Sequence, residues 1–546
     1  MRHSPAHRLA DRIRHGVAHG VVLAALLAGI APARAADLTI ALSAAPSSAD
    51  PYYHDVGPNN ALAAMVFGAL VRTGPRLHPH PDLATAWSVP DDHSWKFTLD
   101  PKAVFQDGAP FTANDVVFSL CRARTGVGPT KSFTNIPKAL TSVDIPDAHS
   151  IILHTRAPEP VLLMQLAGFS IVSAHSAGAV SFSAQENCGV AAMPDSAAFD
   201  HGPMANGTGP YRLLRFTNND AIRLAANPRY DGPRPHWSHV TLRPISAAGA
   251  RLAGLLSGDF DLIENPQAQD LPVLRRHGGF AWTITPSNRI IFLQPDIGRS
   301  PSPLARGPNG ANPLADPRVR EAISLAIDRK AITSRLMEGL GVPADQFLPP
   351  GLFGALPHPP PRPYDPVLAR KLLGEAGLAT GISLTLSAPR GRYIDDAEIA
   401  QAIAQYLTRI GIHTIVDAMT PTMFFPHRTK RDFSLSLGGW GYGTGEASDL
   451  LRHFVVSPMP ARGLGGSDYG AYHSAAFDSA FLQAITTMND GAREKLLEQA
   501  TSIALADNAL IPLHWETSVW AYKDRYTFIG RMDQRTDPDN LSLKAP

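Results

Sequence analysis

The 546-residue chain contains only two cysteines, Cys121 and Cys188, and one long apolar run, which lies near its N-terminus. Two cysteines exclude a disulfide-rich scaffold and a site built from several thiolates. The sequence leaves their pairing open, because Cys121 also fits the apolar face of a helix as a buried thiol. No later segment is apolar over the about 20 residues that a membrane-spanning helix requires.

Motifs of hydrolases and nucleotide-dependent enzymes are also absent. The sequence has no Gly-x-Ser-x-Gly elbow, no His-Glu-x-x-His helix and no phosphate-binding loop ending in Gly-Lys-Ser/Thr. The glycines between positions 438 and 445 lack the spacing of a dinucleotide-binding fingerprint. We expect no cofactor and no metal site, since His78 and His80 fit an exposed loop. A secreted hydrolase stays open as an alternative function.

Neither sign of charge is in clear excess, because 49 Lys and Arg residues face 48 Asp and Glu residues, a formal net charge of +1. The first 35 residues contain five of the arginines and one aspartate, so the remaining chain has a net charge of −3. A near-neutral chain is not attracted to nucleic acid or to an anionic membrane surface. We therefore expect neither as a partner.

The N-terminus has the layout of a secretory signal peptide. Arginines between Arg2 and Arg14 precede the apolar run Val21–Ile30, and small residues lead up to Ala35. The run is about ten residues long, too short to span a membrane. No cysteine lies at the expected cleavage site and no Arg-Arg pair precedes the run, which favours the Sec route without a lipid anchor. Residues 1–35 are thus predicted to be removed, leaving a periplasmic chain.

The length predicts at least two domains, because a single hydrophobic core rarely exceeds about 250 to 300 residues. Alternating apolar residues predict strands over 38–42 and 95–99. The segments 112–115 and 316–317 carry the polar residues and the proline that favour helix N-termini. The chain therefore mixes strands and helices.

Strand and helix patterns alternate over residues 382–440. Period-two apolar residues predict strands over 382–386, 412–416 and 433–437. An amphipathic helix, predicted to begin at Asp395, joins the first two. This order predicts a parallel α/β lobe.

Five short segments stand in a characteristic order along the chain, namely 87–115, 207–211, 255–261, 318–328 and 372–377. Together they resemble the extracellular solute-binding proteins of the family 5 type, which serve dipeptide, oligopeptide and nickel-chelate ABC importers. The resemblance covers nearly the whole chain after residue 35. It implies an α/β fold of the type II periplasmic binding proteins, with two lobes and an extra sub-domain. The implied parts are a discontinuous lobe I (36–66, 205–287 and 516–546), a sub-domain inserted into it (67–204) and lobe II (288–515).

The resemblance implies the substrate-binding component of an ABC importer rather than an enzyme. Such a protein closes its two lobes on a peptide or similar small organic solute and delivers it to permease subunits with their ATPases. We expect a monomer. Binding of a nickel or other metal chelate, whose chelator supplies the metal ligands, stays open, and so does docking to a chemoreceptor.

The ligand is expected beyond the carboxyl ends of the strands of lobe II, where loop amides and helix N-termini converge. Arg390 and Arg392 can pair with a carboxylate there, although two solvated surface arginines are the plainer alternative. Trp440 among glycines predicts a flat apolar wall, with a core tryptophan as the alternative. The resemblance implies an aspartate for an α-ammonium group shortly after the Gly-Trp pair, and this chain has Glu446 and Asp449 instead. The predicted ligand contacts are Tyr53, His54, Asn59, Arg390, Arg392, Tyr393, Trp440, Gly441, Tyr442, Glu446, Asp449 and Trp515.

Overall fold

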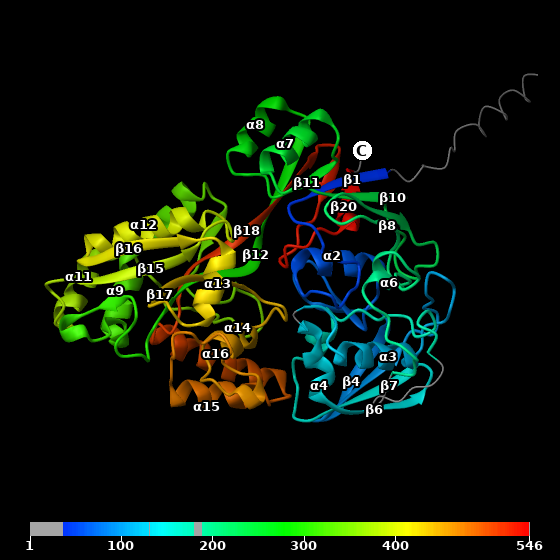
Figure 1. Cartoon of the computed structure of the whole chain (residues 1–546), viewed down its shortest axis with the longest axis horizontal. Coiled ribbons are helices and arrows are strands. Elements are labelled where there is room, and N and C mark those ends of the chain that lie inside the picture. The colour runs from blue at the N-terminus through cyan, green and yellow to red at the C-terminus, as the bar shows by residue number, and fades with distance from the viewer. Residues whose placement is uncertain (1–36, 130, 180–187, 545–546) are drawn as a thin grey trace, which may run out of the picture.

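The computed structural model describes residues 37–129, 131–179 and 188–544, so the predicted signal peptide lies outside the described residues. Two lobes lie side by side, and the long strands β12 (Phe280–Pro295) and β18 (Ile511–Lys523) run from one lobe into the other (Figure 1). One sheet therefore continues through both lobes. Among the described residues, no helix is long and apolar enough to cross a membrane.

The first lobe and its sub-domain share one hydrophobic core. The lobe's strands and the four-stranded sheet β4-β5-β7-β6 bury side chains in the same cluster. Trp95, Phe97 and Leu99 lie in it, as their period-two spacing predicted. A capping box of Thr112 and Asp115 begins α3, which confirms that predicted helix start. The elements of this half are β1 (Asp37–Leu42), α2 (Gly57–Val66), β2 (Val71–Thr73), β3 (Pro79–Pro81), β4 (Ala84–Asp91), β5 (Ser94–Leu99), α3 (Ala113–Arg124), α4 (Asn135–Ala139), β6 (Leu140–Asp147), β7 (Ser150–Thr155), α5 (Leu162–Leu166), α6 (Ala197–Asp200), β8 (Tyr211–Phe216), β9 (Ile222–Ala226), β10 (His239–Pro244), α7 (Ala248–Ser257), β11 (Leu262–Glu264), α8 (Asp270–His277), β19 (Tyr526–Phe528) and β20 (Leu541–Leu543).

The two cysteines form a disulfide in this half of the molecule. Cys121 on α3 and Cys188 have Cα atoms 5.5 Å apart, and both residues are buried in the shared core. The bridge answers the question that the sequence left open. Because it joins positions 67 residues apart, it restricts the unfolded chain and contributes about 2–4 kcal/mol in the usual case.

The second lobe is a doubly wound α/β sheet, with a core on each face. The chain order is β15, β16, β17, whereas β15 lies between the other two and pairs in parallel with both. Between β15 and β17 the ladder joins only Leu386 to Leu435 and Ser387 to Ser436, so the carboxyl ends of these two strands are not paired. Ligands of such sheets bind at this reversal of strand order. The elements are β13 (Ala305–Arg306), α9 (Pro317–Ala326), α10 (Arg329–Ala331), β14 (Gly341–Pro343), α11 (Pro366–Glu375), β15 (Ile382–Pro389), α12 (Asp396–Arg409), β16 (Ile412–Met419), α13 (Pro421–Thr429), β17 (Leu435–Gly441), α14 (Ala447–Phe454), α15 (Ala475–Ala484) and α16 (Asp490–Ala506).

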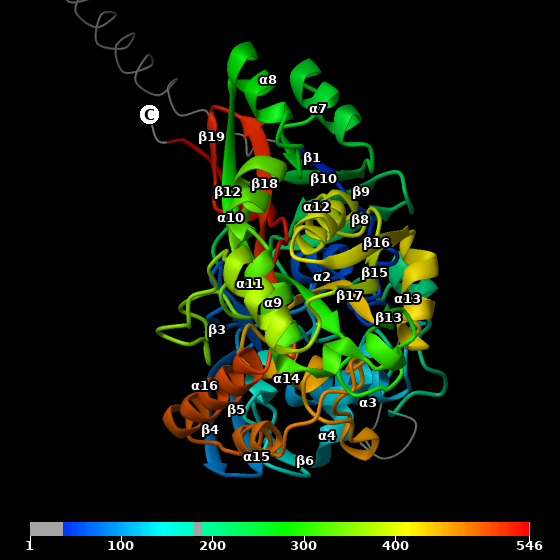
Figure 2. The ribbon, with the colours of Figure 1, turned by 90° about the vertical axis from the view of Figure 1, so that its left-hand side faces the viewer.

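Both predicted helix starts of this lobe are confirmed. Asp316 caps α9 and accepts a hydrogen bond from the backbone N–H of Arg318 at 2.8 Å, as predicted. Asp395 is the N-cap residue of α12, which confirms the predicted start of that helix, although its side chain makes no capping bond and its φ is 51°. Helix α9 lies beside α11 on the outer side of the lobe, as the second view shows (Figure 2).

His514 on β18 is buried in this lobe without a polar partner. It is 1% exposed, and neither ring nitrogen has a hydrogen-bond partner among the described residues. Burial lowers the pKa of His514 from 6.5 to about 3, because the imidazolium ion would lose its hydration. The histidine is therefore neutral in the folded protein.

We expect His514→Leu to reduce the acid sensitivity of the fold. Below pH 6.5 the unfolded chain binds a proton at this histidine and the folded chain does not, so the native protein loses stability as the pH falls toward about 3. Its free energy of unfolding should fall by about 1.4 kcal/mol per pH unit more than that of the variant between about pH 6 and about pH 4. Urea unfolding of both proteins measures this, and equal slopes would contradict the burial argument.

Candidate ligand-binding site

One buried carboxylate holds the loop after β15 in place. Asp396 accepts hydrogen bonds from the backbone N–H groups of Gly391, Arg392 and Tyr393 at 2.9, 2.8 and 3.0 Å. Gly391 has φ of 82°, a conformation that glycine adopts without strain. The side chains of Arg390 and Arg392 remain exposed. The loop backbone is therefore fixed while two guanidinium groups stay accessible.

Tyr393 joins this loop to the end of β17. Its hydroxyl group donates to the carbonyl of Gly439 at 3.2 Å and accepts from the N–H of Gly439 at 3.0 Å. Arg392 lies over the tyrosine ring, with its guanidinium carbon 5.2 Å from the ring centroid. An added Cβ at Gly439 would lie 2.8 Å from that ring, so the close approach requires glycine. The two loops thus meet where β15 and β17 are no longer paired with each other.

Arg289 on β12, which the sequence analysis did not select, lies at the same place. An added Cβ at Gly441 would lie 3.1 Å from its guanidinium group. Its Nε donates to Gln534 at 3.1 Å and lies 3.4 Å from the carboxylate of Glu516 on β18. Burial raises the pKa of Glu516, and the positive charges of Arg289 and Arg392 partly offset this rise by lowering it. Positive charge therefore gathers around the end of β17.

Trp440 is half-buried on the other face of β17. Its indole N–H donates to Asp449 at 3.2 Å, and its ring lies 4.8 Å from that of His453 and 5.2 Å from that of Phe454. Asp449 also accepts from the backbone N–H of Gly443 at 2.6 Å. The carboxylate of Asp449 thus holds the loop that carries Trp440.

Three predicted contacts have partners inside the protein instead. Glu446 is 3% exposed and forms an ion pair with Arg493 at 2.7 Å, so it has a structural role here, and its contact with an ammonium group stays a prediction. The hydroxyl group of Tyr442 and the indole N–H of Trp515 both donate to the carbonyl of Phe347, at 2.9 and 3.1 Å. Neither ring offers a free polar group to a ligand here, because both are buried.

In the first lobe, one of the three predicted contact residues has its hydrogen-bond partners inside the protein. Asn59 is 3% exposed, and its side-chain oxygen accepts from the N–H of Ser47 at 3.1 Å while its amide donates to the carbonyl of Ser48 at 3.3 Å. It therefore shapes the chain after β1, and its contact with ligand stays a prediction. Tyr53 and His54 are half-buried, and their contact with ligand stays a prediction.

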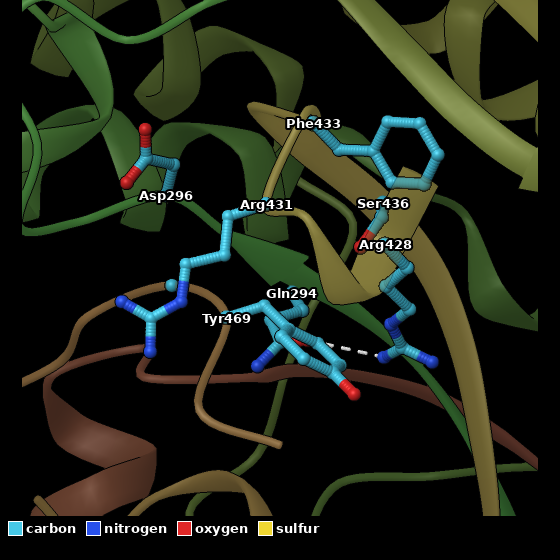
Figure 3. Close-up of a pocket in the computed structure, with 8 residues that line it drawn as sticks. Gln294, Asp296, Arg428, Arg431, Phe433, Ser436 and Tyr469 are labelled. Atoms are coloured by element: carbon cyan, nitrogen blue, oxygen red, sulfur yellow. Dashed lines mark hydrogen bonds between the residues drawn. The ribbon is translucent and has the colours of Figure 1, made fainter. Parts of the chain in front are cut away.

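A small pocket is lined by Ser436 of β17 (Figure 3). Ser436 and Trp440 lie on the same face of the strand, because side chains alternate along it. It is small, with a cavity volume of about 10 Å³, and part of it is open to solvent. Arg428 points into it and donates to Gln294 at 3.0 Å. The sequence analysis selected none of its residues. The lining residues are Gln294, Asp296, Arg428, Arg431, Phe433, Ser436, Tyr469 and Gly470.

Ser457, His473 and Asp478 lie together without the geometry of a catalytic triad. The hydroxyl group of Ser457 lies 2.6 Å from Asp478 and 2.8 Å from Nδ1 of His473, whereas that Nδ1 is 3.5 Å from Asp478. A triad needs the histidine between the other two, with the carboxylate orienting it. Within the described part of the chain, no group of three or more His, Cys, Asp and Glu residues is placed to hold a metal ion.

Two α/β lobes joined by long crossover strands, with basic and aromatic loops where they meet, define a two-lobed solute-binding protein. The chain belongs to the bacterial extracellular solute-binding proteins, family 5, whose middle-region model matches residues 78–458. This confirms the predicted family and fold class.

Relatives and solved structures cover almost the whole chain. The glutathione-binding protein GsiB of Salmonella typhi is 26% identical over 507 residues, which cover 91% of this chain and 92% of GsiB. DppA of Helicobacter pylori in complex with the peptide STSA has a TM-score of 0.72 at 21% identity, covering 93% of this chain and 98% of DppA. NikZ of Campylobacter jejuni in complex with Ni(L-His) has a TM-score of 0.73 at 19% identity, covering 93% and 99%. The matched family and relatives are binding proteins rather than enzymes.

We expect Glu446→Gln to destabilise the protein by about 3 kcal/mol, because it leaves the buried guanidinium group of Arg493 without its main counter-charge. The matched control is Asp490→Asn. Asp490 is the other partner of Arg493, and its 76% exposed side chain predicts a loss below about 1 kcal/mol. Urea unfolding compares the two variants. Unchanged stability of Glu446→Gln, together with weaker solute binding, would return Glu446 to the ligand site.

Proposed function

We propose that the protein is the periplasmic substrate-binding component of an ABC importer and captures a small organic solute of the peptide or glutathione class. The observation that carries this proposal is the loop after β15, whose backbone is fixed by Asp396 while Arg390 and Arg392 stay exposed. A guanidinium group on a preformed loop can bind a carboxylate through two parallel hydrogen bonds. Trp440 would form the wall beside the bound solute.

The signal-peptide layout of residues 1–35 supports export to the periplasm, with cleavage after Ala35. In this proposal a monomer delivers the solute to permease subunits, whose ATPases drive import. Lobe I and lobe II keep the boundaries predicted from the sequence.

The hinge would lie in the crossover strands. The pairing of β12 with β18 shifts register between Pro286 and Ile290, and the hydroxyl group of Ser287 bonds to the carbonyl of Glu516 at 2.9 Å there. A break in a strand ladder lets the strand bend without losing the pairs on either side. Rotation of the lobes about this place would close them on the solute.

The lobes also approach each other away from the hinge. An added Cβ at Gly445, in the loop after β17, would lie 3.2 Å from the Cβ of Leu77 in the sub-domain. In the closed protein, the loop after β17 would contact the sub-domain at Gly445 and Leu77. Gly445 has φ of 68°, so glycine suits this position for its conformation and for its size.

Native mass spectrometry of the mature protein, purified gently from periplasm, tests the function. We expect a discrete bound solute with at least one acidic group.

Once the solute is identified, Arg392→Ala and Trp440→Ala should each weaken its affinity at least about tenfold, or about 1.4 kcal/mol, by calorimetry. Arg276→Ala, which changes an exposed arginine on α8, is the control. Unchanged affinity in both site variants would contradict the placement, and an empty protein that cleaves model esters would favour the hydrolase alternative.

A matched pair of glycine variants tests closure. Gly445→Val and Gly463→Val introduce the same strain, because φ is 68° and 66°, and each should cost about 1–2 kcal/mol of stability. An added Cβ at Gly463 meets no atom within 4 Å, whereas at Gly445 it meets Leu77. In small-angle X-ray scattering of the solute-bound protein, only Gly445→Val should increase the radius of gyration. Equal radii for both variants would show that this contact does not limit closure.

A further inference from the structure

Arg428, near the end of α13, is a buried cation without a carboxylate partner among the described residues. Its side chain is 5% exposed, one terminal nitrogen donates to Gln294 at 3.0 Å, and Nε has no hydrogen-bond partner there. Buried charges are normally paired, because removing an ion from water is costly. The unpaired guanidinium group therefore needs an explanation.

Aromatic rings compensate for part of this burial. The guanidinium carbon lies 5.9 Å from the ring centroid of Phe424, 5.5 Å from that of Phe454 and 5.3 Å from that of Tyr469. Cation–π contacts stabilise a desolvated arginine. Burial nevertheless lowers the pKa of Arg428, although Tyr393 and Tyr469 act in the opposite direction. An anion in the adjoining pocket would supply the missing counter-charge.

The charged side chains around the pocket that Arg428 lines favour a negatively charged group. Arg431 lines it too, from the chain that follows α13 (Figure 3). Its one carboxylate, Asp296, is already paired with Arg299 at 3.0 Å and accepts from Ser302 at 2.5 Å. Burial raises the pKa of the neighbouring Asp468 to about 7, so that group is only partly ionised at neutral pH. The two arginines are thus not neutralised by the pocket itself.

Arg428 lies next to the Trp440 wall. An added Cβ at Gly438 would lie 2.5 Å from the guanidinium group of Arg428, so this position of β17 leaves room for it only as glycine. Gly438 and Trp440 point to the same face of the strand and are about 7 Å apart, at two residues along a strand. Phe454 touches both Arg428 and Trp440. A solute lying on Trp440 can therefore extend one group toward Arg428.

Acidic side chains near this wall already have partners inside the protein. Glu446 is paired with Arg493, and Asp449 is held by Trp440 and by the N–H of Gly443. The surroundings of the proposed site therefore favour negative over positive charge in the solute.

We propose that the pocket lined by Arg428, Arg431, Gln294 and Ser436 binds a second acidic group of the solute, so that the protein selects small peptide-like solutes with two carboxylates. This inference rests on the proposed function, because it takes the first carboxylate to lie at Arg390 or Arg392. It deepens that proposal by naming the class of solute.

The test compares two peptides that differ in one group, Ala-Glu and Ala-Gln. The native protein is unfolded and refolded with its disulfide intact to remove bound solute, and both peptides are titrated by calorimetry. We expect Ala-Glu to bind at least about tenfold more tightly than Ala-Gln. Arg428→Gln should reduce this preference to within about twofold, while the control Arg276→Gln retains it.

A second variant keeps the test decisive if Arg428→Gln does not fold. Ser436→Asp places a carboxylate of the protein in the pocket, where it would pair with Arg428, and the preference for Ala-Glu should again disappear. Equal affinities of the native protein for the two peptides would overturn this inference and leave the proposed function standing, as would a preference that survives both pocket variants. Binding of neither peptide and of no glutathione would instead overturn the proposed solute class itself.

Discussion

The antiparallel pairing of β12 with β18 is the interaction on which the rest of the structure depends. The two strands pair over Phe280–Pro286 in one lobe and over Ile290–Leu293 in the other, so both lobes are parts of one sheet. Relative motion of the lobes must pass through the irregular stretch between these two runs. Arg289 and Glu516 lie at that stretch, beside the end of β17. A change in the backbone at the hinge would therefore move residues of the proposed ligand site.

The two loops at this site are held by the same kind of interaction. Asp396 and Asp449 each accept hydrogen bonds from backbone N–H groups and so hold the loops after β15 and β17. A carboxylate used in this way is not available to a ligand, whereas Arg392 remains exposed. The acids therefore shape the site and the arginines define its charge. This division of roles favours an anionic solute.

Local patterns predicted the strands of lobe II and the caps of α3 and α9, because alternation, capping residues and proline act over a few neighbours. The start of α12 at Asp395 was also predicted. The role of Asp396 was not, since the two aspartates are adjacent in the sequence and only the turn decides which carboxylate faces the loop N–H groups. The sequence indicates Arg289 only weakly, as a lone arginine directly before an apolar run. It does not indicate Arg428, because the partners of that residue lie on β12 and in residues 469–470.

The sequence by itself determined the family, the fold class and the two loops where the solute is expected, because the order of motifs and the period of apolar residues are properties of neighbouring residues. The tertiary structure alone decided the pairing of Cys121 with Cys188 and the engagement of Glu446 by Arg493, 47 residues further along the chain. It also decided that Arg428 is buried without a counter-charge. Burial and pairing depend on segments that meet only after folding. The charged groups that can bind a ligand are those that find no partner inside the folded protein.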